Sequence, residues 1–178
     1  MRKAGILMPI TSLPSPWGVG TLGETAREFV DFLKKGGQSC WQVLPIGPTG
    51  YGDSPYQSFS SFAGNPYLID LDDLSEEGLL SPEEYRHISW GEDPARTDYG
   101  LLYQHRFQVL EKAVKRMERK WPEELEEFCE KEKDWLNDYA LFMALKEKFQ
   151  GDPWSRWPRP LRVREEEAVL RARGELAN

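Results

Sequence analysis

The chain has 178 residues, of which 39% are hydrophobic and 12% aromatic, enough for a globular domain with a core. Its 23 Lys and Arg against 30 Asp and Glu give a formal net charge of −7, which excludes nucleic acid as an expected partner because that binding needs clustered cations. No apolar run approaches the ~20 residues that cross a bilayer, and no signal-type apolar core follows Arg2-Lys3. We therefore expect a cytoplasmic protein without a membrane partner.

The cysteines, histidines and serines show no spacing typical of a metal site or of a nucleophile with its base. Cys40 and Cys129 are far apart and lack a CxxC spacing, so we expect two reduced thiols that serve as small apolar residues. His87 and His105 have no partner at ligand spacing, and no serine has an identifiable base. We expect no metal site.

The first 70 residues hold a strand, helix, strand pattern. A buried strand is expected at Ile6–Met8 and a second at Cys40–Leu44, each ended by a proline. Between them, residues 24–35 show apolar positions at helical spacing, and Gly36-Gly37 supplies a C-cap. Such a unit predicts two parallel strands with a right-handed crossover, and hence an α/β fold.

A long loop over residues 47–67 follows the second expected strand, where parallel folds commonly carry their chemistry. Its candidate ligand-binding side chains are Tyr51, Asp53, Ser54, Tyr56 and Gln57. Flat rings suit the C–H faces of a sugar, and hydrogen-bonding groups suit its hydroxyl rim, so this mixture favours a neutral polyhydroxylated ligand. The alternative is that the tyrosines only pin the loop to the domain, and residue chemistry leaves both possibilities open.

Residues 71–178 are richer in charge and are expected to be helical. Ser81-Pro82-Glu83-Glu84 predicts a capping box that opens a short helix. From Tyr103 the apolar positions step by three and four as far as Trp121, which predicts a helix with a buried apolar stripe. We expect a second helix over residues 122–149, antiparallel to the first, and a last one from about Leu161 that continues to the end of the chain.

The segment from Ile6 to Asp70 resembles the amino terminus of the 4-α-glucanotransferases, also called amylomaltases or disproportionating enzymes. The main matching motifs are Thr11-Ser12-Leu13-Pro14, Trp41-Gln42-Val43-Leu44-Pro45-Ile46-Gly47-Pro48-Thr49, Tyr51-Gly52-Asp53-Ser54-Pro55-Tyr56-Gln57-Ser58-Phe59-Ser60 and Ala63-Gly64-Asn65-Pro66-Tyr67. The likeness continues through Asp98-Tyr99-Gly100-Leu101-Leu102-Tyr103 and residues 135–145. Thr21 departs from it, because many members have Asp there.

The resemblance implies a (β/α)₈ TIM barrel with a helical insertion subdomain. On that basis residues 1–70 are the first βαβ unit of the catalytic barrel, with residues 47–67 as its substrate loop, and residues 71–178 are the insertion. The family performs retaining transfer of α-1,4-glucan segments between maltooligosaccharide, starch or glycogen chains without a cofactor. Its catalytic acids lie on later strands, so we expect this chain to be an amino-terminal part, inactive alone, whose partner is the remainder of the barrel.

The resemblance also implies roles for individual residues. Ser54 and Tyr56 match loop positions that line the glucan subsites beside the scissile bond, and Asp53 is the acid of the same loop. Tyr51 and Tyr103 match tyrosines of a second glucan site, although core packing competes for Tyr103. Two other functions stay open: a helical protein-interaction module over residues 98–150, and part of a related α-glucan hydrolase.

Overall fold

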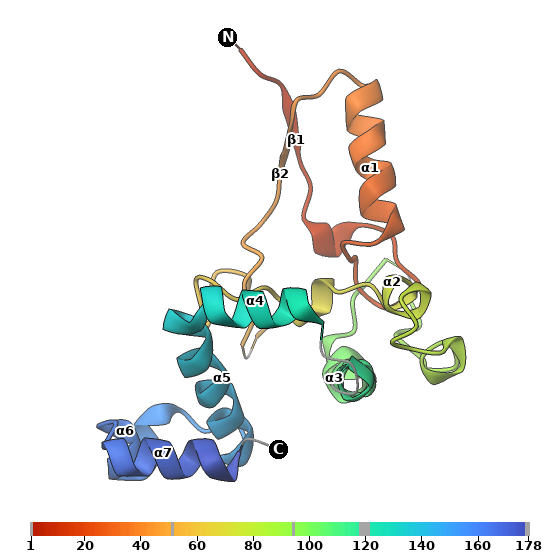
Figure 1. The fold of residues 1–178 in the computed structure, drawn as a ribbon. Helices are drawn as coiled ribbons and strands as arrows, with labels where there is room; N and C mark the ends of the chain where they lie inside the picture. Colours follow the sequence, from red (N-terminus) through yellow and green to blue (C-terminus); the bar gives the residue numbers. More distant parts are fainter. Residues whose placement is uncertain (1, 51, 94, 118–121, 177–178) are drawn as a thin grey trace. The chain divides into compact units, whose positions relative to one another are not determined.

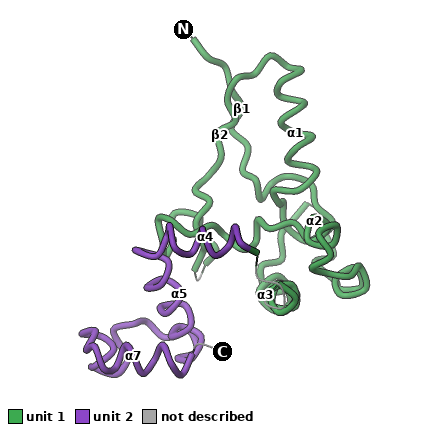
Figure 2. Tube along the Cα trace, viewed as in Figure 1, with its two compact units in different colours: residues 1–122 green, residues 123–178 purple. Residues whose placement is uncertain are grey.

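The computed structural model describes residues 2–50, 52–93, 95–117 and 122–176. The chain forms two compact units, Met1–Pro122 and Glu123–Asn178 (Figure 2). Within the described residues, no helix is both long enough and apolar enough to span a bilayer.

The first unit contains the predicted strand, helix, strand pattern. Strand β1, Gly5–Leu7, pairs in parallel with β2, Cys40–Gln42, and α1, Glu24–Lys35, runs alongside both (Figure 1). The rings of Phe29 and Trp41 meet edge to face at 5.0 Å and join the helix to the sheet. The α/β prediction is confirmed for this unit.

The prediction that the first strand is buried is wrong. Ile6 is 39% exposed and Leu7 56% exposed, and Cys40 in β2 is a free, exposed cysteine. The sheet has two strands in the described part of the chain. A two-stranded sheet has few neighbours to cover it, so side chains that read as buried in the sequence remain exposed.

Short elements connect the strands to the next helix. They are the single turns η1, Ile10–Ser12, η2, Pro66–Leu68, and η3, Pro82–Glu84, and the helix α2, Leu71–Glu76. The capping box predicted at residue 81 is present, with the Ser81 amide donating to Glu84 Oε2 at 2.9 Å. It opens one 3-10 turn rather than an α-helix.

Helix α3, Tyr99–Met117, begins one turn before the expected Tyr103, and among its described positions the buried face coincides with the predicted stripe only at Leu110. Tyr103 is 76% exposed and Val114 45% exposed, whereas the fully or almost fully buried positions are Leu102, Arg106, Val109, Leu110 and Ala113. Because Arg106 stands in the middle of the buried face, the pattern of hydrophobic residues did not identify that face. Trp121, the last residue of the predicted stripe, lies outside the described residues.

The main core of the first unit crosses residue 70. Trp17 and Val19 pack in one cluster with Leu71, Tyr85 and Leu102. Contacts from both sides of residue 70 therefore belong to one compact unit, and the boundary between units falls after Pro122 instead. The change of sequence character at residue 70 is not a boundary between compact units.

The second unit is helical, with two interruptions that were not expected. The single helix predicted over residues 122–149 is α4, Glu123–Lys131, followed by α5, Lys133–Lys148. The predicted last helix is α6, Arg159–Arg162, followed by α7, Glu166–Glu175, with Arg164 at a φ of 56° between them. Leu141, Leu145, Trp157 and Ala172 form the core of this unit. The antiparallel pairing of residues 103–121 with 122–149 links the two units and stays a prediction.

Candidate functional site

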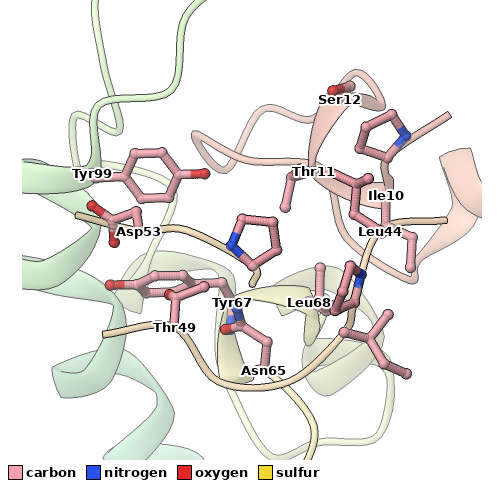
Figure 3. A pocket seen from close by; sticks show the side chains of 14 residues that line it. Ile10, Thr11, Ser12, Leu44, Thr49, Asp53, Asn65, Tyr67, Leu68 and Tyr99 are labelled. Carbon is pink, nitrogen blue, oxygen red and sulfur yellow. The ribbon is translucent and has the colours of Figure 1, made fainter. Parts of the chain in front are cut away.

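A hollow of about 210 Å³ lies in the first unit, and its lining includes Ile10 and Leu44, which follow β1 and β2 in the chain (Figure 3). Segments that follow both strands, the turn at residues 65–68 and the first residue of α3 supply its walls. Its polar lining includes Thr11, Ser12, Thr49, Asp53, Asn65, Tyr67 and Tyr99, and its apolar lining includes Ile10, Leu44 and Leu68.

The loop of residues 47–67 is held in place by hydrogen bonds at both ends. A bridge joins Thr49 to Ser58, and the Asn65 amide donates to the Ile46 carbonyl at 2.8 Å. Asn65 Oδ1 then accepts from the Tyr67 amide at 2.9 Å and caps the turn η2, whose first residue is Pro66. These contacts bring Tyr67, at the end of the loop, back to the hollow that Asp53 also lines.

Asp53 is the acid of the hollow. Its amide donates to the Gly50 carbonyl at 3.1 Å, and its φ of 53° places it in the left-handed region, which Asp tolerates better than most residues. Burial raises the pKa of this carboxyl above its usual value. The carboxylate lines the hollow and can accept a hydrogen bond from a hydroxyl group there.

Two tyrosines accompany Asp53. Tyr67 is 5% exposed, and its ring centroid lies 6.2 Å from that of Tyr99. Burial raises the pKa of Tyr67 to about 12, with the nearby charge of Asp53 as the next cause. The pKa of Tyr99 is raised for the same two reasons. Figure 3 shows Asp53 between the two rings, so two neutral phenols and one carboxylate share the polar end of the hollow.

This combination suits a neutral polyhydroxylated ligand better than an ion. Phenol groups that stay protonated can donate or accept, the Asp53 carboxylate accepts, and Asn65 Oδ1 is already used in its own turn. Ring faces and the side chains of Ile10, Leu44 and Leu68 give apolar contact area. In the described part of the chain, no group of three or more His, Cys, Asp or Glu could hold a metal ion.

The predicted site residues are only partly gathered at the hollow. Asp53 lines it, whereas Ser54 and Tyr56 are not in its walls. Tyr56 is 74% exposed, and its amide donates to Ser54 Oγ at 3.4 Å. Tyr103 is 76% exposed on α3, where its ring meets Phe107 edge to face at 6.4 Å. Tyr51 lies outside the described residues. The roles of these four in glucan binding stay predictions.

Tyr67 and Tyr99 were missed as site residues. Tyr99 lies four residues before Tyr103 and continues its helical spacing, and Asn65-Pro66 before Tyr67 is typical of a capped turn that returns the chain to the protein. Both signals mark local structure. The packing of the turn against α3, which brings the two rings together, is a tertiary contact that these signals do not predict.

Comparison with known proteins agrees with the geometry. The sequence model of the 4-alpha-glucanotransferase family matches residues 8–178. The chain is 54% identical over 180 residues to the 4-alpha-glucanotransferase of Thermus thermophilus and 48% identical over 169 residues to that of Clostridium butyricum, covering 99% and 95% of this chain. It spans 35% of the length of each of these relatives.

A solved structure described as amylomaltase from Streptococcus agalactiae in complex with acarbose superposes with a TM-score of 0.96 at 46% identity. The match covers 99% of this chain and 36% of that one. The whole described fold, including its helical residues, is therefore a fold found within that larger protein.

Proposed function

The chain belongs to the 4-alpha-glucanotransferase family, and we propose that it takes part in moving α-1,4-glucan segments between maltooligosaccharide, starch or glycogen chains. The observation that carries the proposal is the family match over residues 8–178. The hollow supports it independently, because a carboxylate between two neutral phenols is suited to sugar hydroxyls.

We further propose that β1, α1 and β2 are the first βαβ unit of a (β/α)₈ barrel and that residues 71–178 are a helical insertion. The parallel pairing of Gly5 with Cys40 supports the first part. Exposed apolar side chains on the same unit, Leu7 at 56% and Phe32 at 66%, are suited to packing against the remaining strands and helices of that barrel.

In this proposal the hollow holds one glucose unit. The Asp53 carboxylate accepts a hydrogen bond from a sugar hydroxyl, the Tyr99 phenol donates or accepts at the rim, and a ring face packs on the C–H face of the sugar. Shielding half of one tyrosine ring corresponds to on the order of 2 kcal/mol before ordering costs. The chain's own residues thus bind and orient the substrate.

Ser54 and Tyr56 are proposed to border the sugars beside the scissile bond, and Tyr51 and Tyr103 a second glucan site. The exposure of Tyr56 and Tyr103, 74% and 76%, leaves both rings free to meet a ligand. Retaining transfer needs two carboxylates ~5 to 5.5 Å apart across the bond. The resemblance assigns that pair to strands beyond this chain, so we expect no transfer by the chain alone.

The experiment is a calorimetric titration of the chain with maltotriose and maltoheptaose. Asp53→Asn removes the charged acceptor from the hollow and should weaken binding about fivefold to tenfold. Asp31→Asn, an exposed change on α1, is the matched control and should bind as the wild type does. Absence of binding by the wild-type chain, or equal affinities for the two variants, would contradict the proposed site.

The two other candidate functions are less favoured. A helical interaction module does not account for a family match that includes residues 8–70 as well as the helices. Hydrolysis and transfer use the same glucan, and the relatives from Thermus thermophilus and Clostridium butyricum are named as transferases. A cytoplasmic location stays a prediction.

A further inference from the structure

A fully buried arginine contacts the turn that carries Tyr67. Arg106, in the middle of α3, is 0% exposed, and its Cζ lies 5.7 Å from the centre of the Trp90 ring. Burial lowers its pKa to about 10, which still leaves the group charged at neutral pH. No carboxylate of the described residues forms a salt bridge with it. A buried charge is costly unless it is paired, so its contacts call for a specific explanation.

Arg106 donates its hydrogen bonds to the backbone next to the site. Its Nη2 donates to the Tyr67 carbonyl at 3.3 Å and also to the Ile69 carbonyl. Its Nε and Nη1 are buried and have no partner among the described residues. The hydrogen bonds of the guanidinium therefore go to the end of the turn η2. Carbonyl groups at the end of a helical turn lack partners within the helix.

The turn is fixed on both sides of Tyr67. The Tyr67 amide donates to Asn65 Oδ1 at 2.9 Å, and the Leu68 carbonyl accepts from the Leu22 amide at 2.8 Å. Arg106 supplies the donor for the carbonyls on either side of Leu68. Without it, the buried hydrogen bond to the Tyr67 carbonyl and the partly buried one to the Ile69 carbonyl would both be lost.

The same helix also holds the ring of Tyr67. Its centroid lies 6.2 Å from that of Tyr99 and 5.7 Å from that of Phe107, both on α3. Arg106 lies between these two positions in the sequence. Helix α3 thus controls both the backbone and the ring of a residue that lines the hollow.

We propose that Arg106 is a positioning residue for glucan binding: it anchors the turn that carries Tyr67, and so sets the shape of the hollow without touching the sugar. This inference rests on the proposed function of the hollow. The competing explanation is that Arg106 only stabilises the fold.

Arg116 offers a matched control for that explanation. It lies on the same helix and also donates to a backbone carbonyl, that of Leu79, at 2.8 Å, while pairing with Glu84. It is not among the residues that line the hollow. Arg106→Met and Arg116→Met each remove a guanidinium from α3 and keep an unbranched apolar side chain. Because Arg106 is buried and the Arg116 side chain is 37% exposed, the two variants are compared by the Tyr67 resonances and by ligand affinity, and not by stability.

The first measurement needs no ligand. Ring resonances of Tyr67 are assigned in the full chain by comparison with Tyr67→Phe and are then followed in each variant. Arg106→Met should move them, and Arg116→Met should leave them in place. Unchanged Tyr67 resonances in Arg106→Met would overturn the positioning role even if the hollow proves not to bind glucan.

The second measurement is the affinity for maltotriose. Arg106→Met should weaken binding about tenfold, and Arg106→Lys, which keeps a charged donor without the planar fork, about threefold. In a Tyr67→Ala background, Arg106→Met should cause no further loss, because it acts through Tyr67.

Equal losses in Arg106→Met and Arg116→Met, or a full additional loss in the Tyr67→Ala background, would overturn the inference. If Arg106→Met does not fold, Arg106→Lys decides by the same two readouts. Unmoved Tyr67 resonances and unchanged affinity in that variant would count against a positioning role.

Discussion

Single side chains explain why the segment before α2 adopts its path. The Thr21 hydroxyl donates to Asp70 Oδ2, while Asp70 Oδ1 accepts from the amides of Asp72 and Asp73 at 2.9 and 3.2 Å and caps α2. Thr21 is 4% exposed. At position 21 this chain has a hydroxyl donor that satisfies the second oxygen of the capping carboxylate.

Removing that hydroxyl should destabilise the first unit. Thr21→Val keeps the shape of the side chain but leaves a half-buried carboxylate oxygen without its donor, which we expect to cost about 1 to 2 kcal/mol in the free energy of unfolding. Thr21→Ser keeps the donor and should cost less. Urea unfolding of the two variants is the measurement. Equal stability would show that the hydrogen bond contributes nothing.

Glu84 gives a pH dependence with a defined sign. The hydrogen bond from Arg116 and the one from the Ser81 amide hold the pKa of Glu84 at about 2, below its ordinary value of 4.5. Since the folded pKa is lower than the unfolded one, this contribution to stability is complete above about pH 5 and is lost as the pH falls toward 2. Glu84→Gln should therefore reduce the change in unfolding midpoint between pH 6 and pH 3. An unaltered pH profile in the variant would contradict this assignment.

The elements differ in how well the sequence predicts them. Helix α1 ends where expected because its signals are local: apolar spacing, Lys34 and Lys35 in the last turn, and a glycine cap. The break between α6 and α7 was not predicted, because it lies at Arg164 in a left-handed conformation with no glycine or proline to mark it. The exposure of Leu7 depends on neighbouring strands, which no local pattern reports.

For α3, the predicted and observed buried faces give opposite expectations for two substitutions. Leu102 is 0% exposed in the main core, and Leu102→Ala should cost about 2 to 5 kcal/mol. Val114, which belongs to the predicted stripe, is 45% exposed, and Val114→Ala should cost less than about 1 kcal/mol. Guanidinium unfolding of both variants tests the assignment. If Val114→Ala lost more stability than Leu102→Ala, the predicted stripe would be the buried face after all.

In the molecule as a whole, β1 and α1 carry several exposed apolar side chains. Leu7 is 56% exposed, Val30 50% and Phe32 66%. Uncovered strands and apolar helix faces favour association, so the folded chain should self-associate as its concentration rises. Light scattering across a concentration series measures this. A monomer at every concentration would contradict this expectation.

In the candidate site, too, the residue marked by its local sequence was predicted, and the residues brought in by tertiary contacts were not. Asp53 was predicted because its loop has an unusual composition that resembles a known family, and it does line the hollow. Its two partners come from the end of the loop and from the start of α3. That Tyr67 and Tyr99 face one acid follows from how the turn packs on the helix, a contact between residues far apart in the chain.

The central claim is that the hollow around Asp53, Tyr67 and Tyr99 binds an α-1,4-glucan. Amide chemical-shift mapping of the chain during a titration with maltotriose tests it most directly. We predict saturable shifts that centre on the amides of Thr49, Asp53, Asn65, Tyr67, Leu68 and Tyr99, and that weaken in Asp53→Asn. Saturable shifts confined to other surfaces, such as the exposed Trp154, or no saturable shifts at all, would contradict the account.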